Sequence, residues 1–240
     1  MKRLCLLWLV FWSLLSAVAL ATPWSDVAEP APGPARAIGS YAAGCMQGGI
    51  PLPPEGPGFQ VMRRERRRFF GHPLLVRYLQ ELAASTRRQQ SGVLLIGDLG
   101  QPRGGPMPSG HRSHQTGLDV DIWFWMPRDE GALTAAGRET IGAPSMLTAT
   151  RGALDTQQWS SRQVDVLRLA TTPDAVARVF VNPVIKRALC SQFPGAACDN
   201  LKNRLVRVRW DFLLQMRHPE CFHTPDLAIV RRRRAGYDPK

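Results

Sequence analysis

The sequence predicts a single α+β domain with an antiparallel or mixed sheet. Apolar residues recur at helical spacing in Pro73–Ser85, whereas Val93–Asp98 and Leu118–Trp125 are compact apolar runs typical of buried strands. Helical and strand patterns mix along the chain without the regular alternation of a doubly wound sheet. The chain contains no internal repeat. We therefore expect one layered domain rather than a parallel α/β fold or a solenoid.

Residues 1–21 are predicted to be a secretory signal peptide. Met1–Arg3 is basic, Leu4–Val18 is apolar apart from two serines, and Ala19 and Ala21 form a small-residue cleavage site. The apolar core has about 15 residues, whereas a bilayer span needs about 20, so a membrane anchor is the weaker interpretation. We expect export, cleavage before Thr22 and no stable membrane insertion afterwards.

Further elements follow from the same patterns. Pro73 suits the first turn of the first helix. Ala37–Cys45 is rich in small residues and is expected to be irregular. Loops rich in proline and glycine are expected at Pro30–Pro34, Gly48–Gly58 and Gly100–Gly110, and a loose stretch at Pro127–Gly152. Downstream, we expect a helix at Ser161–Ala170, a strand at Val176–Val181, and a helix from Asn182–Pro183 through Leu189.

Four cysteines remain after the expected cleavage. Cys45, Cys190, Cys198 and Cys221 are candidates for two disulfides in an oxidising compartment, with three possible connectivities. Cys190 and Cys198 can close a short loop. They lack the spacing of a zinc knuckle or a redox pair, which favours a structural role.

The net charge of +12 is concentrated in arginine clusters. These lie at residues 63–68, 87–88 and 231–234. Such clusters can meet nucleic acid, anionic lipid or an acidic polymer. Export excludes most nucleic-acid partners and leaves lipid headgroups and wall polymer. For any single cluster, a solvated charged face is the alternative.

Candidate metal ligands crowd into eleven positions, between residues 111 and 121. Asp119 and Asp121 have the spacing that puts both on one face of a strand. His114 precedes Asp121 by seven residues, and Gly117 allows the chain to turn between them. Imidazole and carboxylate are zinc ligands, so this turn predicts one shared ion, with His111 as a further ligand or proton carrier. The alternative is that these are loop histidines and turn-capping aspartates.

Two neighbouring polar residues are expected to support such a site. Ser113 and Gln115 can supply hydrogen bonds that fix the tautomers of the imidazoles.

Residues Gly110–Ile122, Gly-His-Arg-Ser-His-Gln-Thr-Gly-Leu-Asp-Val-Asp-Ile, resemble the signature of penicillin-insensitive murein endopeptidases. These are zinc peptidases related to D-Ala-D-Ala carboxypeptidases and the hedgehog domain. The likeness continues, in order, at Ala21–Trp24, Gly39–Ser40, Gly44–Cys45, Arg67–Pro73, Leu95–Asp98 and Val179–Lys186.

The resemblance implies a periplasmic hedgehog-like domain that cleaves D-alanyl to meso-diaminopimelyl cross-links in peptidoglycan. His114 and Asp121 match zinc ligands, and His111 matches an outer histidine that also contacts metal. Asp119 lies in the motif without a ligand role, and the catalytic residues stay unassigned. Because such a site has no serine nucleophile for the drug to acylate, the resemblance also explains the insensitivity to penicillin.

The chain departs from the family downstream. The family closes its zinc site with a strand carrying His-x-x-His-x-His, whereas Leu213 and Met216 occupy the first two histidine positions here. His218 falls at the offset of the last ligand from Trp210, with a surface histidine as the alternative, and His223 has less support. We therefore expect a murein endopeptidase domain at residues 22–200 and a divergent, Arg-rich tail at residues 201–240, for which a frameshift is one explanation.

Three functions follow as hypotheses. The first is a zinc-dependent murein endopeptidase. The second is a catalytically impaired protein that still binds peptidoglycan, because the second ligand strand has lost its histidines. The third is a membrane-surface or nucleic-acid binder acting through Arg231–Arg234, which is less favoured because no aromatic stacking pattern accompanies the arginines.

Overall fold

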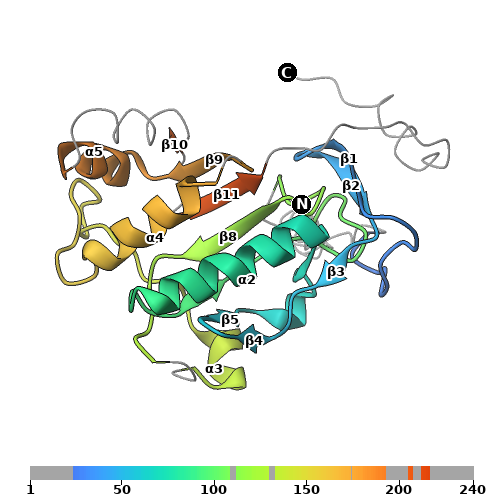
Figure 1. Cartoon of the computed structure of the whole chain (residues 1–240), viewed down its shortest axis with the longest axis horizontal. Helices are drawn as coiled ribbons and strands as arrows, with labels where there is room; N and C mark the ends of the chain where they lie inside the picture. Colours follow the sequence, from blue (N-terminus) through green and yellow to red (C-terminus); the bar gives the residue numbers. More distant parts are fainter. Residues whose placement is uncertain are drawn as a thin grey trace, which may run out of the picture.

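The molecule is a mixed α+β domain built on one large sheet, as expected (Figure 1). The computed structural model describes residues 24–108, 112–129, 133–173, 175–192, 205–207 and 212–216. Seven strands form the sheet in the order β10-β9-β11-β8-β7-β5-β4. The β5–β7 and β9–β10 pairs are parallel and the others antiparallel. The strands are β4 (Glu55–Gly56), β5 (Phe59–Val61), β7 (Leu94–Ile96), β8 (Asp119–Trp123), β9 (Val176–Val181), β10 (Leu205–Arg207) and β11 (Phe212–Met216).

Two helices lie side by side against this sheet (Figure 1). Helix α2 (Pro73–Arg88) begins where His72 Nδ1 accepts the Leu74 N–H, with Pro73 in the first turn as expected. Helix α4 (Ser161–Thr171) begins with a capping box between Ser160 and Gln163. Their apolar faces are buried in one core with β8, which contains Leu75, Leu79, Leu82, Val164, Leu167, Val120 and Ile122.

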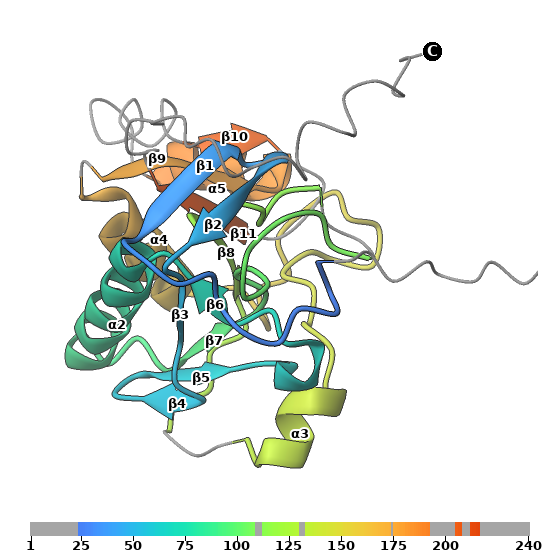
Figure 2. The same ribbon diagram turned by 90° about the vertical axis from the view of Figure 1, so that its right-hand side faces the viewer.

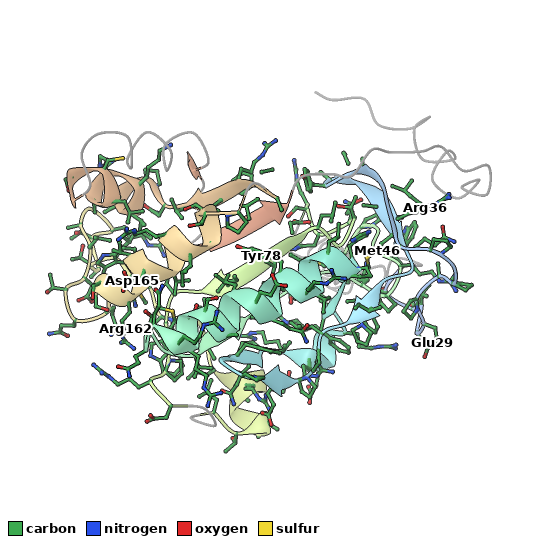
Figure 3. The ribbon with its side chains drawn as sticks, in the orientation of Figure 1. Glu29, Arg36, Met46, Tyr78, Arg162 and Asp165 are labelled. Atoms are coloured by element: carbon green, nitrogen blue, oxygen red, sulfur yellow. The ribbon has the colours of Figure 1, made fainter. Side chains whose placement is uncertain are left out.

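A buried hydrogen bond joins the two helices. The Tyr78 hydroxyl (labelled in Figure 3) donates to the Ala170 carbonyl oxygen at 2.9 Å, and burial raises the pKa of this phenol. Replacement of Tyr78 by phenylalanine leaves that oxygen without its donor. We expect the free energy of unfolding to fall by about 1 kcal/mol, measured by urea denaturation. An unchanged midpoint would show that water replaces the hydroxyl.

The Ala37–Cys45 segment is not irregular, and that expectation is wrong. It forms an antiparallel hairpin of β1 (Arg36–Ser40) and β2 (Ala43–Gln47), in which Gly39 lies opposite Gly44. A Cβ on Gly44 would come within 2.5 Å of the Ser40 carbonyl oxygen, so the close backbone approach requires glycine. Small residues, which weaken an alternating pattern, are what allow this hairpin to form.

Two expected loops also contain short elements. Gly48–Gly58 includes β4 and β3 (Ile50–Pro51), which pairs with β6 (Phe70–Gly71). The loose stretch Pro127–Gly152 contains α3 (Ala135–Thr140), capped by the Thr134 hydroxyl, which accepts the Gly137 N–H. Figure 2 shows α3 and the β1–β2 hairpin at opposite ends of the molecule.

The last helix forms where the sequence predicts it, whereas one of the cysteines does not pair as predicted. Helix α5 (Pro183–Gln192) follows β9, as expected, and the Asn182 side chain caps it. Cys45 is a free, buried thiol, so the prediction that it joins a disulfide is wrong. The pairing of Cys190 stays a prediction, because Cys198 and Cys221 lie outside the described residues. No helix in the described part of the chain is long and apolar enough to cross a bilayer.

Candidate metal centre

A glycine hinge brings His114 back towards strand β8. Gly117 has φ +66°, and its carbonyl oxygen accepts the His72 N–H at the start of α2. A Cβ on Gly117 would meet the sulfur of Met46 (labelled in Figure 3) and would lie 2.9 Å from the His72 nitrogen. The left-handed turn and the close packing therefore both require glycine.

The hinge gathers one imidazole and two carboxylates. His114 Nε2 lies 3.5 Å from Asp121 Oδ1, and His114 Nδ1 lies 3.4 Å from Asp119 Oδ2. His114 and Asp119 are fully buried, whereas the Asp121 side chain is 25% exposed. The three residues that the sequence predicts to be close together are therefore neighbours in the structure. Asp121 forms the solvent-facing side of the group.

Asp119 holds His114 in an unusual conformation. His114 has φ +67°, a left-handed value that residues with side chains rarely adopt. Its N–H donates to Asp119 Oδ2 at 2.8 Å, and its Nδ1 lies 3.3 Å from the Asp119 carbonyl oxygen. Asp119 thus contacts both the backbone N–H and the Nδ1 side of the ring of His114. The other ring nitrogen, Nε2, therefore faces Asp121.

The group has more negative than positive charge. Burial by itself lowers the pKa of His114, but the carboxylates of Asp119 and Asp121 outweigh it and raise the pKa to about 10. Burial raises the pKa of Asp119, against the opposing influence of His114. Two carboxylates therefore draw positive charge towards one buried imidazole.

Gln115 was expected to hydrogen-bond to an imidazole, but its described hydrogen bonds all go to backbone groups. Its side chain contacts backbone rather than imidazole: Nε2 donates to the carbonyl oxygens of Ala42 and Arg112, and Oε1 accepts the Gly44 N–H. Ser113 hydrogen-bonds to Asp119, which partly offsets the rise that burial causes in the pKa of that carboxyl. Among the described residues Gln115 therefore does not fix the tautomer of His114, and it attaches the loop to the β1–β2 hairpin.

The described part of the chain contains no complete metal-binding group. No group of three or more His, Cys, Asp or Glu side chains is positioned there to hold a metal ion. His111, His218 and His223 lie outside the described residues. Strand β11 runs antiparallel to β8, with Leu213 opposite Asp121 and Gln215 opposite Asp119. Strand β11 thus adjoins β8, and the residue at the register position of Asp121 is a leucine, which has no donor atom for a metal.

Asp98 is a neighbour that the sequence reasoning did not single out. Its carbonyl oxygen accepts the Asp121 N–H, and its charge contributes to the raised pKa of His114. Arg68 Nη1 binds its carboxylate at 2.8 Å, with both side chains buried. An acidic residue in the turn that ends a buried strand is the sequence signal that marks this position.

Comparisons with known proteins agree with the motif. The sequence profile described as penicillin-insensitive murein endopeptidase matches residues 37–217. Proteins named penicillin-insensitive murein endopeptidase from Salmonella paratyphi C, Salmonella paratyphi B and Salmonella newport are each 41% identical to this chain over 182 residues. The aligned region covers 76% of this chain and 66% of each relative, so the chain spans just under two thirds of their length.

Proposed function

The chain belongs to the penicillin-insensitive murein endopeptidase family, and from this premise we propose that it is a zinc-dependent peptidase of the periplasm. Its proposed substrate is peptidoglycan, and the proposed bond is the cross-link from D-alanine to meso-diaminopimelate. The observation that carries the proposal is the pair formed by His114 Nε2 and Asp121 Oδ1.

The spacing of this pair suits one zinc ion. Ligands at about 2.0–2.2 Å from a tetrahedral ion lie about 3.3–3.5 Å from each other. The separation of His114 Nε2 and Asp121 Oδ1 is 3.5 Å, and the surrounding negative charge favours a cation. The donor set, one imidazole and one carboxylate, is also one that zinc accepts.

His114, Asp121 and Asp119 have different roles in this proposal. His114 and Asp121 would hold the ion, which when bound acidifies a water molecule and polarises the scissile carbonyl group. Asp119 fixes the ring of His114 from its inner edge, the arrangement by which a carboxylate orients a metal-binding histidine. Asp121, as the exposed member, faces the side from which a peptide approaches.

A second candidate function is a catalytically impaired protein that binds peptidoglycan. The observation in its favour is the register of β11, which puts Leu213 opposite Asp121. With fewer protein ligands, zinc would bind more weakly and with more water. A missing histidine that served as the acid-base group would lower the rate by about 10²–10⁴-fold.

One experiment separates the two functions. The purified full chain is dialysed against zinc, its metal content is measured by elemental analysis, and cross-linked muropeptides are offered with and without EDTA. One zinc per chain and EDTA-sensitive release of un-cross-linked stems are the results expected of a peptidase. Binding to purified sacculi without release of stems would instead establish the impaired protein.

Asp119 offers a more specific test of the zinc site. Replacement by asparagine keeps the shape of the side chain but removes the charge that faces His114 Nδ1. We expect zinc affinity to fall by about 10- to 100-fold, measured by competition with a chromophoric chelator. The same substitution at Asp165 on α4 should leave affinity unchanged, and equal losses in both variants would contradict the assignment.

A further inference from the structure

An arginine-rich turn with an unusual backbone follows strand β5. It contains a single turn of 3₁₀ helix, Arg64–Arg66, flanked by Arg63 (φ +54°) and Arg67 (φ +55°). Both flanking residues adopt the left-handed conformation that favours glycine, which costs about 1–2 kcal/mol per residue. Non-glycine residues kept in such conformations are enriched at functional sites, so the placement of this turn is informative.

Helix α3 and the residue that follows it hold the turn in place. Glu139 accepts the Arg64 N–H at 2.8 Å and the Glu65 N–H at 3.4 Å. Arg63 donates its N–H to the Arg138 carbonyl oxygen and its Nη2 to the Ile141 carbonyl oxygen, both at 3.1 Å. The conformation is therefore imposed by a segment more than 70 residues away in the chain.

Two guanidinium groups of the turn lie against residues that adjoin the candidate metal centre. Arg66 Nη1 lies 3.7 Å from Asp98 Oδ2, and Asp98 accepts the backbone N–H of Asp121. Arg63 lies over the indole of Trp123, 5.9 Å from the ring centroid. A Cβ on Gly97 would lie 3.2 Å from Asp121 Cβ and 3.3 Å from Trp123 Nε1, so Asp121 and Trp123 flank this glycine.

The positive charge here is not fully neutralised. Arg68 already binds Asp98 at 2.8 Å in the buried pair, so Arg66 is the more distant second cation on one carboxylate. The Arg66 side chain is 42% exposed, which leaves it accessible to a ligand. Burial, followed by the charge of Arg138, lowers the pKa of Arg64, which reflects the crowding of cations in this region.

We propose that Arg63 and Arg66 form a carboxylate-binding subsite beside Asp121, which takes the free carboxylate next to the scissile bond. The proposal rests on the proposed function for the identity of the peptide. In a D-alanyl to meso-diaminopimelyl cross-link, the carbon that bears the scissile nitrogen also bears a free carboxylate. Guanidinium groups are suited to bind that carboxylate, because their paired N–H donors match its two oxygens.

Binding without turnover tests the subsite. The full chain is kept in EDTA and titrated calorimetrically with a cross-linked muropeptide dimer, either with this carboxylate free or with it converted to an amide. We expect the free carboxylate to bind about tenfold more tightly in the unchanged protein, as one charge-assisted hydrogen-bonded contact allows. Arg66→Gln should lose most of this preference.

The matched control is Arg77→Gln, which removes one positive charge from the exposed surface of α2. This variant should keep the preference. Arg66 is a cleaner test than Arg63, because the Arg63 side chain also holds Ile141. Arg63→Lys, which keeps the charge but not the paired donors, should retain only part of the preference.

Several results would contradict the proposal that Arg63 and Arg66 form a carboxylate-binding subsite. One is an unchanged preference in Arg66→Gln, and another is an equal loss in Arg77→Gln. A third is a loss of binding to anionic lipid vesicles in Arg66→Gln with the peptide preference intact, which would assign the arginines to a membrane surface. A zinc-loaded protein that cleaves nothing but shows the preference would refute the proposed function alone, and cleavage without any preference would refute the subsite alone.

Discussion

Replacement of Asp121 by asparagine is expected to remove both zinc binding and hydrolysis of cross-linked muropeptides. Asp121 is one of the two side chains that we propose as ligands, and its Oδ1 lies 3.5 Å from Nε2 of the other, His114. Loss of an outer-shell partner costs about 10- to 100-fold in metal affinity, so loss of a direct ligand should exceed about 100-fold. The affinity is measured by chelator competition and the hydrolysis by chromatography of the released stems.

The matched control is Asp165→Asn on α4 (Figure 3), where a partly buried aspartate outside the site loses the same charge. It should retain zinc and activity. Because asparagine preserves the volume of aspartate, the thermal unfolding of Asp121→Asn should show a folded protein. Full zinc content and full hydrolysis in folded Asp121→Asn would show that the ion is held elsewhere.

Replacement of Gly117 by alanine is expected to destabilise the domain and disrupt the metal centre together. The left-handed conformation costs an alanine about 1–2 kcal/mol. Its Cβ would also press on Met46 and on the His72 nitrogen, and such overpacking costs about 1–3 kcal/mol. We expect a total loss of about 2–5 kcal/mol, which corresponds to a fall in Tm of roughly 4–20 °C for a domain of this size.

Gly142→Ala provides the control, since a Cβ there would have no neighbour within 4 Å. Its Tm should stay within a few degrees of the unchanged protein, as measured by circular dichroism. Zinc affinity should fall only in Gly117→Ala, because that hinge carries His114 towards Asp121. Equal Tm values for the two variants would show that the chain has another way to make this turn.

The sequence identified the parts of the fold and site that depend on neighbouring residues. The helices α2, α4 and α5 and the strands β7, β8 and β9 follow from apolar spacing, with Pro73 and Asn182–Pro183 as additional signals at the starts of α2 and α5. His114, Asp119 and Asp121 also lie within a segment of eight residues, so their proximity depends on local structure. Strand alternation and one glycine hinge are enough to predict that these side chains meet.

Other features were missed because their cause lies far away in the chain. The β1–β2 hairpin depends on a glycine pair and on Gln115, which binds the hairpin backbone from 71 residues away. The Arg63–Arg67 turn depends on Glu139 and Ile141. Local patterns contain no information about such contacts, since each becomes favourable only after the rest of the domain has folded.

By itself, the sequence determined the family, the short motif and the chemical character of the site, because these depend on residue type and local spacing. Only the tertiary structure decided which nitrogen of His114 faces Asp121, that Leu213 lies opposite Asp121, and that Arg66 approaches Asp98 while Arg63 lies over Trp123. The physical reason is that strand register and side-chain burial are properties of the packed sheet. They arise from contacts between segments that the order of residues does not bring together.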